Sequence, residues 1–125
     1  MARKALIVDD DPSLRMLLGM TLKSKGFECT EASDGQEGFR TALKINPDLI
    51  LLDLSMPNMN GFEACEKLRG HEKTRTTPIL VLSGESTDLN KDILSGTLKA
   101  TGFLAKPFDR ARFIEALSRI FPDIP

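Results

Sequence analysis

Short apolar segments of strand length alternate with segments of helical periodicity along the whole of this 125-residue chain. The strand-like segments cover residues 5–8, 27–31, 49–52, 78–82 and 103–105. Because strands that alternate with helices form parallel sheets covered on both faces, this pattern predicts a doubly wound α/β fold. A chain of this length has room for one hydrophobic core, so residues 1–125 are expected to form a single domain.

The remaining segments have the spacing of amphipathic helices. Three of them begin after residues that are typical N-caps: Asp11, Asp34 and Asp109. In the first helix, four residues follow one another at helical spacing: Leu14, Leu17, Leu18 and Thr21. In the last helix, we expect Ile114, Leu117 and Phe121 to face the core. The fourth helix, about residues 87–99, is the weakest, because Gly96 interrupts it.

The second strand differs from the others because its apolar and polar residues alternate. Alternation is typical of a strand with one solvent-facing side, whereas the interior strands of a parallel sheet are apolar throughout. The second strand is therefore expected at an edge. An edge position for it fits the strand order 2-1-3-4-5 of the flavodoxin-like (βα)5 fold.

Charge and composition exclude several classes of protein. The chain has 17 basic and 18 acidic residues and a net charge of −1, so it has no basic field to attract nucleic acid or anionic lipid. Its apolar runs are too short to span a bilayer, and it begins without the apolar stretch of a signal peptide. We therefore expect a cytoplasmic location. Cys29 and Cys65 lack the spacing of a metal site and are expected to be reduced thiols.

Polar residues follow four of the five predicted strands. Asp9 and Asp10 follow the first strand, Asp53 the third, Ser83 the fourth and Lys106 the fifth. The carboxyl ends of parallel strands meet at one edge of a sheet, where doubly wound folds bind their ligands. Crowded carboxylates repel one another unless a cation joins them, and oxygen ligands suit Mg²⁺. The sequence therefore predicts a magnesium site at this edge.

A carboxylate beside such a cation can act as a nucleophile toward phosphorus and form an aspartyl phosphate. The cation on one side and Lys106 on the other would hold the transferring group. The hydroxyl of Ser83 could then donate a hydrogen bond to a phosphoryl oxygen. These residue types predict phosphoryl-transfer chemistry at the sheet edge.

Five motifs together resemble the receiver domain of two-component response regulators, the CheY-like superfamily. They are Val8-Asp9-Asp10-Asp11-Pro12, Asp53-Leu54-Ser55-Met56-Pro57, Gly61-Phe62-Glu63, Ser83-Gly84 and Lys106-Pro107-Phe108. Each motif alone is weak, but the set, in the family's order and with roughly its spacing, is highly specific. The resemblance covers essentially the whole chain.

The resemblance implies a role for each residue of the predicted magnesium site. Asp53 would be the phospho-acceptor. Asp10 and Asp53 would ligate Mg²⁺ directly, Asp9 would act through water, and Ser55 would contribute its main-chain carbonyl. Lys106 would pair with the phosphoryl group.

Two further residues would form the switch. Ser83 would supply the switch hydroxyl, and Phe103 the aromatic ring whose inward rotation is coupled to it. A plain core position remains the alternative for Phe103. The phosphodonor would be a histidine kinase, a phosphotransfer protein or a small molecule such as acetyl phosphate.

The output expected from the resemblance is a changed face formed by the fourth helix, the fifth strand and the fifth helix. That face would control a downstream protein partner, from a monomer or a phosphorylation-dependent dimer, without direct contact to nucleic acid or membrane. Such a protein is not an enzyme beyond its own phosphorylation and slow dephosphorylation. The residues that follow the last predicted helix are too few for a DNA-binding or enzymatic domain, so we expect a stand-alone receiver in preference to a domain cut from a longer protein.

Two alternatives to the phosphorylation switch are considered. A receiver-fold module that acts without phosphorylation would not need Asp9, Asp10, Asp53, Ser83 and Lys106, all of which are present. A phosphatase of the haloacid dehalogenase type also uses an aspartate nucleophile at a strand end. That class needs a second acid two residues later, where this chain has Ser55.

Overall fold

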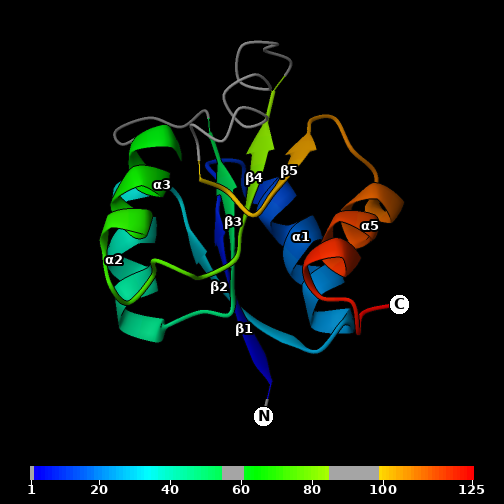
Figure 1. Cartoon of the computed structure of the whole chain (residues 1–125). Helices are drawn as coiled ribbons and strands as arrows, with labels where there is room; N and C mark the ends of the chain where they lie inside the picture. The colour runs from blue at the N-terminus through cyan, green and yellow to red at the C-terminus, as the bar shows by residue number, and fades with distance from the viewer. Residues whose placement is uncertain (1, 55–60, 85–98) are drawn as a thin grey trace.

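A computed structural model of the chain describes residues 2–54, 61–84 and 99–125. Five parallel strands form one sheet in the order β2-β1-β3-β4-β5, which confirms the predicted 2-1-3-4-5 topology (Figure 1). The strands are β1 (Arg3–Val8), β2 (Phe27–Ala32), β3 (Leu49–Asp53), β4 (Ile79–Ser83) and β5 (Gly102–Ala105). The helices are α1 (Pro12–Ser24), α2 (Gly35–Ile45), α3 (Gly61–Gly70) and α5 (Arg110–Ile120). None of the helices in these ranges could cross a membrane.

The sheet is covered on both faces, with α2 and α3 on one side and α1 and α5 on the other (Figure 1). Alternate residues of each inner strand enter opposite layers of the core. In β1, Leu6 and Val8 pack in the layer that contains α2 and α3, and Ala5 and Ile7 pack in the layer of α1 and α5. This two-sided burial explains why the inner strands are apolar at every position.

The helix starts follow the N-cap prediction. Asp11, Asp34 and Asp109 each have extended backbone, and their side chains accept hydrogen bonds from N–H groups of the first turn. Gly26 follows the end of α1 with a φ of 91°, a conformation that favours glycine, so the chain turns there into β2. The predicted fourth helix falls mostly on residues 85–98, outside the described ranges.

Two residues of the predicted helical patterns are less buried than their neighbours. Leu17 is 44% exposed, while Leu18 is completely buried. In α5, Phe113 is buried, whereas Ile114, which we expected to face the core, is only half-buried. Neighbouring helical positions differ by roughly 100° around the axis, so a residue next to a buried one lies on a different side of the helix. The face that packs here is the one that carries Phe113 and Leu117.

Candidate functional site

Three carboxylates lie together where β1 and β3 end. One carboxylate oxygen from each of Asp9, Asp10 and Asp53 lies within 4.8 Å of the others. Asp9 and Asp53 are buried, with 0% and 2% of their surfaces exposed, whereas Asp10 is exposed. Buried carboxylates that face each other repel unless positive charge reaches them. The cluster therefore requires a cationic partner.

The strand pairing brings these carboxylates together. β1 and β3 are adjacent and parallel, and Val8 pairs with Leu52, so the residues that follow lie side by side. Asp53 is itself the last residue of β3 and pairs with Leu82 of β4. The chain crosses from β1 to the edge strand β2 and returns to β3, which makes this edge the topological switch point where such folds bind ligands.

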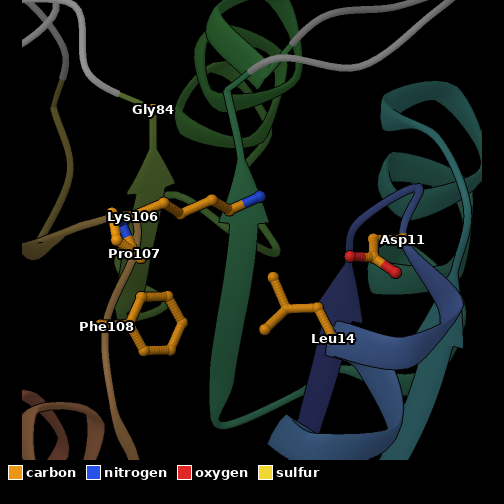
Figure 2. Close-up of a pocket in the computed structure, with 6 residues that line it drawn as sticks. All are labelled: Asp11, Leu14, Gly84, Lys106, Pro107 and Phe108. Carbon is orange, nitrogen blue, oxygen red and sulfur yellow. The ribbon is translucent and has the colours of Figure 1, made fainter.

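Lys106 supplies positive charge to both buried carboxylates. Its Nζ lies 3.2 Å from Asp9 Oδ2 and 3.3 Å from Asp53 Oδ2. Burial by itself lowers the pKa of Lys106, but the attraction of Asp53 and Asp9 outweighs it, and the pKa lies above its ordinary value. Figure 2 shows the side chain extending from the end of β5 toward the end of β3. Lys106 is thus a fixed cation at the acidic cluster.

The position of Lys106 follows from the pairing of β4 with β5. Ser83 pairs with Ala105, and the N–H of Lys106 donates to the Ser83 carbonyl at 2.6 Å. The Lys106–Pro107 peptide is cis. These contacts hold the start of the β5–α5 loop against the end of β4.

Ser83 and Phe103, the two predicted switch residues, lie on these same strands. The Ser83 side chain is fully buried, and its Oγ has no hydrogen-bond partner within the described part of the chain. Phe103 pairs with Val81 in the sheet and is partly buried against the core layer of α2 and α3. A buried hydroxyl without a partner costs free energy, so Ser83 carries an unused donor beside the cluster.

Asp9 is held by contacts other than its ion pair. Its N–H donates to the Ala32 carbonyl, and its Oδ1 accepts from the N–H of Asp11. Its own carbonyl accepts from Arg15 on α1. The sequence analysis singled out neither Arg15 nor these contacts, because no local pattern signals a hydrogen bond to a main-chain carbonyl.

Beside Lys106 the surface forms a pocket of about 460 Å³. Its lining residues are Asp11, Leu14, Gly84, Lys106, Pro107 and Phe108. Figure 2 shows Leu14 of α1 and Phe108 of the β5–α5 loop on opposite sides of it. The pocket therefore has apolar walls and Lys106 at its boundary. The predicted carbonyl ligand, Ser55, falls outside the described residues.

Comparison with known proteins identifies the family. The sequence matches the response regulator receiver domain over residues 5–118. The chain belongs to this family. As the strand order and the sequence motifs predicted, it is a CheY-like receiver domain, and receiver domains serve as signalling switches in two-component systems.

Solved structures of receiver domains superpose closely on this one. Chemotaxis protein CheY4 of Vibrio cholerae is 36% identical with a TM-score of 0.86, over 96% of this chain and 99% of that one. The receiver domain of sensor histidine kinase PA1611 from Pseudomonas aeruginosa is 30% identical with a TM-score of 0.81, over 95% and 97%. That structure has a magnesium ion coordinated in its active-site cleft.

Curated relatives include longer regulators. The DNA-binding dual master transcriptional regulator RpaA of Synechocystis is 39% identical over 108 residues, which cover 85% of this chain and 44% of that protein. The transcriptional regulatory protein SrrA of Staphylococcus aureus is 42% identical over 110 residues, 86% of this chain and 43% of SrrA. The receiver domain therefore spans less than half the length of these relatives. Response regulators of this kind interact with histidine kinases and act on downstream targets.

Proposed function

We propose that this receiver domain is a phosphorylation switch whose acceptor is Asp53. The observation that carries the proposal is the position of Lys106 Nζ, 3.3 Å from Asp53 Oδ2 and 3.2 Å from Asp9 Oδ2, at the edge where three carboxylates converge. A nucleophilic carboxylate, a fixed ammonium and a set of oxygen ligands are the parts that phosphoryl transfer needs.

In the proposed reaction, a carboxylate oxygen of Asp53 attacks the phosphorus of a phosphohistidine or of acetyl phosphate. A new O–P bond forms, and the bond from phosphorus to the histidine nitrogen or to acetate breaks. Lys106 lies beside Asp53 and would pair with a phosphoryl oxygen, which stabilises the negative charge on the transferred group. The pKa of Lys106 lies above its ordinary value of 10.5, so the ammonium is protonated at neutral pH.

The residues present fit a hard divalent cation. Within the described ranges the cluster consists of three carboxylates, and oxygen ligands of this kind suit Mg²⁺. Asp10 and Asp53 would ligate it directly, Asp9 through water, and Ser55 through its carbonyl. When bound, Mg²⁺ would neutralise charge on the carboxylates and the phosphoryl oxygens. The magnesium-containing receiver domain of PA1611 supports this assignment by similarity.

Ser83 and Phe103 form the proposed switch. The Ser83 hydroxyl is buried and without a partner in the described ranges, so an acceptor oxygen on Asp53 would satisfy it. A phosphoryl group adds such oxygens and up to about two negative charges. Ser83 would move toward it, and Phe103 would fill the space that Ser83 leaves. The gained hydrogen bond is the differential contact that shifts the conformational equilibrium.

The phosphodonor would be a histidine kinase, a phosphotransfer protein or a small phosphodonor such as acetyl phosphate. The output would be a changed face formed by the predicted fourth helix, β5 and α5. This face would control a downstream protein. On that face a cavity of about 310 Å³ is lined by residues that include Phe103, Arg112, Glu115 and Arg119. We propose protein contact by a monomer or a phosphorylation-dependent dimer, without direct binding of nucleic acid.

Intact mass after incubation with acetyl phosphate, with and without Mg²⁺, tests this function. We expect a gain of one phosphoryl group that requires Mg²⁺ and is lost in Asp53→Asn. Asp34→Asn is the matched control, because Asp34 caps α2 at the same edge of the sheet and asparagine also caps helices. If wild-type protein that binds Mg²⁺ gains no phosphoryl group from acetyl phosphate or from a phosphorylated kinase, the phosphorylation-independent module replaces this proposal.

A further inference from the structure

Arg15 joins three elements through two hydrogen bonds. It lies in the first turns of α1, and its side chain is 18% exposed. One terminal nitrogen donates to the main-chain carbonyl of Asp9 at 2.7 Å, and Nε donates to Glu31 Oε1 at 2.8 Å. Glu31 is the penultimate residue of the edge strand β2 and pairs with Ile7. Arg15 therefore connects α1, the end of β2 and the loop that carries the acidic cluster.

The carbonyl of Asp9 is part of the peptide that leads into Asp10. Since a peptide unit is planar, the position of this carbonyl oxygen sets the plane in which the N–H and Cα of Asp10 lie. On the other side of Asp9, the N–H donates to Ala32, at the end of the same strand β2. The Val8–Asp9 peptide is thus bonded to the end of β2 directly, and the Asp9–Asp10 peptide is bonded to it through Arg15 and Glu31.

Asp10 needs such support more than its neighbours do. Asp9 and Asp53 are buried, so packing restricts their side chains, but Asp10 is exposed. Its carboxylate nevertheless lies within 4.8 Å of theirs. A hydrogen bond that orients the preceding peptide therefore supplies the restraint on Asp10 that burial does not.

Glu31 neutralises the charge of Arg15, so that Arg15 does not repel a bound cation. An unpaired arginine beside a site for a divalent cation would repel that cation. Here the Glu31 carboxylate lies against the guanidinium, so the pair is neutral as a whole. Arginine can span both acceptors because its planar guanidinium presents several N–H donors in a fixed fork, which a lysine ammonium lacks.

We propose that Arg15 is a positioning residue of the cation site, which orients the Asp9–Asp10 peptide so that the Asp10 carboxylate can bind Mg²⁺, with Glu31 holding Arg15 in place. This inference rests on the proposed function, since it assumes that Asp10 is a ligand. It assigns no contact between Arg15 and the cation or the phosphoryl group.

Two explanations of the role of Arg15 predict opposite changes in Mg²⁺ affinity when it is replaced. If Arg15 acts only through its charge, its removal strengthens Mg²⁺ binding, because a positive charge near the site is lost. If Arg15 positions Asp10, its removal weakens binding. We expect Arg15→Gln to raise the Kd for Mg²⁺ about tenfold, at the low end of the loss reported for residues that orient metal ligands.

The measurement is a Mg²⁺ titration of the unphosphorylated protein, followed by the amide shifts of its ¹H–¹⁵N spectrum. Arg119→Gln is the matched control, because Arg119 forms an exposed ion pair with Glu115 on α5 and its loss changes the net charge equally. We expect its Kd to equal that of the wild type. The ¹⁵N shift of Asp10 without Mg²⁺ should move in Arg15→Gln, since its peptide loses the hydrogen bond, and should not move in Arg119→Gln.

Further variants test separately the charge of Arg15, its hydrogen bonds and its contact with Glu31. Arg15→Lys retains the charge without the fork and should bind Mg²⁺ more weakly than the wild type; it decides the question if Arg15→Gln does not fold. Glu31→Gln should weaken Mg²⁺ binding less than Arg15→Gln does. The double variant with both substitutions should weaken it no more than Arg15→Gln alone. Wild-type or tighter binding by folded Arg15→Gln or by Arg15→Lys overturns the role of Arg15. If the wild-type protein shows no saturable shift that Asp10→Asn abolishes, the cation site itself fails, and the proposed function fails with it.

Discussion

Gly61 lies against the main chain of Asp53. A β-carbon at Gly61 would collide with the carbonyl oxygen of Asp53 and with the Cα of Leu54. The N–H of Gly61 also donates to the Leu54 carbonyl at 3.2 Å. The start of α3 therefore rests directly on the strand end that carries the proposed acceptor. Only glycine allows this approach, because the neighbouring atoms belong to the backbone and cannot move aside cheaply.

We expect Gly61→Ala to impair both stability and phosphorylation. Forcing a methyl group into packed backbone costs about 1–3 kcal/mol of unfolding free energy. The displaced Asp53 should accept a phosphoryl group from acetyl phosphate about tenfold more slowly, since misplacement of a reacting group is costly. Urea unfolding followed by circular dichroism and the rate of adduct formation by mass spectrometry test the two parts.

Gly70→Ala is the control for this prediction. Gly70 ends the same helix, and among the described residues no atom outside its chain neighbours and its own helix backbone lies within 4 Å of the β-carbon that alanine would add. Alanine should be neutral there, or stabilising by up to about 1 kcal/mol through helix propensity. Equal effects of the two substitutions would contradict the role assigned to Gly61.

Lys106 should stabilise the protein most when no divalent cation is present. In Lys106→Met the buried carboxylates of Asp9 and Asp53 lose their charged hydrogen-bond partner, which should cost about 1–3 kcal/mol. Added Mg²⁺ would replace that charge, so it should raise the melting temperature of Lys106→Met more than that of the wild type. Differential scanning calorimetry with and without Mg²⁺ measures this, with the exposed Lys44→Met as control.

The same interaction has a defined pH dependence. The pKa of Lys106 is raised by Asp53 and Asp9 against the lowering effect of burial. Because the pKa of Lys106 is higher in the folded than in the unfolded protein, its ion pairs contribute fully to stability at pH values below the ordinary pKa of 10.5. This contribution is lost as the pH rises through the pKa of Lys106 in the folded protein. The stability difference between wild type and Lys106→Met should therefore persist at neutral pH and shrink above about pH 10.5. A difference that grows with pH in that range would refute this account.

Ser83→Ala should leave the unphosphorylated protein as stable as the wild type or slightly more so. The Ser83 hydroxyl is buried without a partner in the described ranges, and removing an unsatisfied polar group recovers up to about 1 kcal/mol. Thr74→Val is the contrast, since the buried Thr74 hydroxyl donates to the Leu68 carbonyl and its loss should destabilise. After phosphorylation, Ser83→Ala should show a smaller chemical-shift change at Phe103. If the chemical-shift change at Phe103 is as large in Ser83→Ala as in the wild type, the movement of Phe103 does not depend on Ser83.

Arg69 should stabilise the position of residues 99–101, which directly precede β5. Its guanidinium donates to the carbonyls of Lys99, Thr74 and Thr77. Arg69→Gln removes most of these bonds, and we expect a loss of about 1–3 kcal/mol. The amide of Thr101, which donates to the Ile79 carbonyl, should exchange faster with solvent. Hydrogen exchange of Arg69→Gln, compared with that of Arg119→Gln, which replaces an exposed arginine, measures the effect. Equal protection of the Thr101 amide in the two variants would contradict the role assigned to Arg69.

The fold could be predicted because its signals are local and repeated. Apolar strands of two-sided burial and N-caps such as Asp11 indicated a doubly wound α/β fold, and the one alternating strand fitted the order 2-1-3-4-5, an inference that the structure confirms. The faces of individual helices were less certain, as Leu17 and Phe113 illustrate. Each lies near the boundary of the apolar face of its helix, and the packing of that helix on the sheet decides which side of the boundary is buried.

The sequence alone established the residue types at the strand ends, and the inferred strand order predicted that Asp9, Asp10, Asp53, Ser83 and Lys106 would lie at one edge of the sheet. The way in which they are held depends on tertiary contacts. Arg15 bonds a main-chain carbonyl, Gly61 rests on the backbone of Asp53, and Lys106 lies between two carboxylates. Contacts of this kind join residues far apart in the chain or involve backbone atoms that every residue has, so no local pattern reveals them.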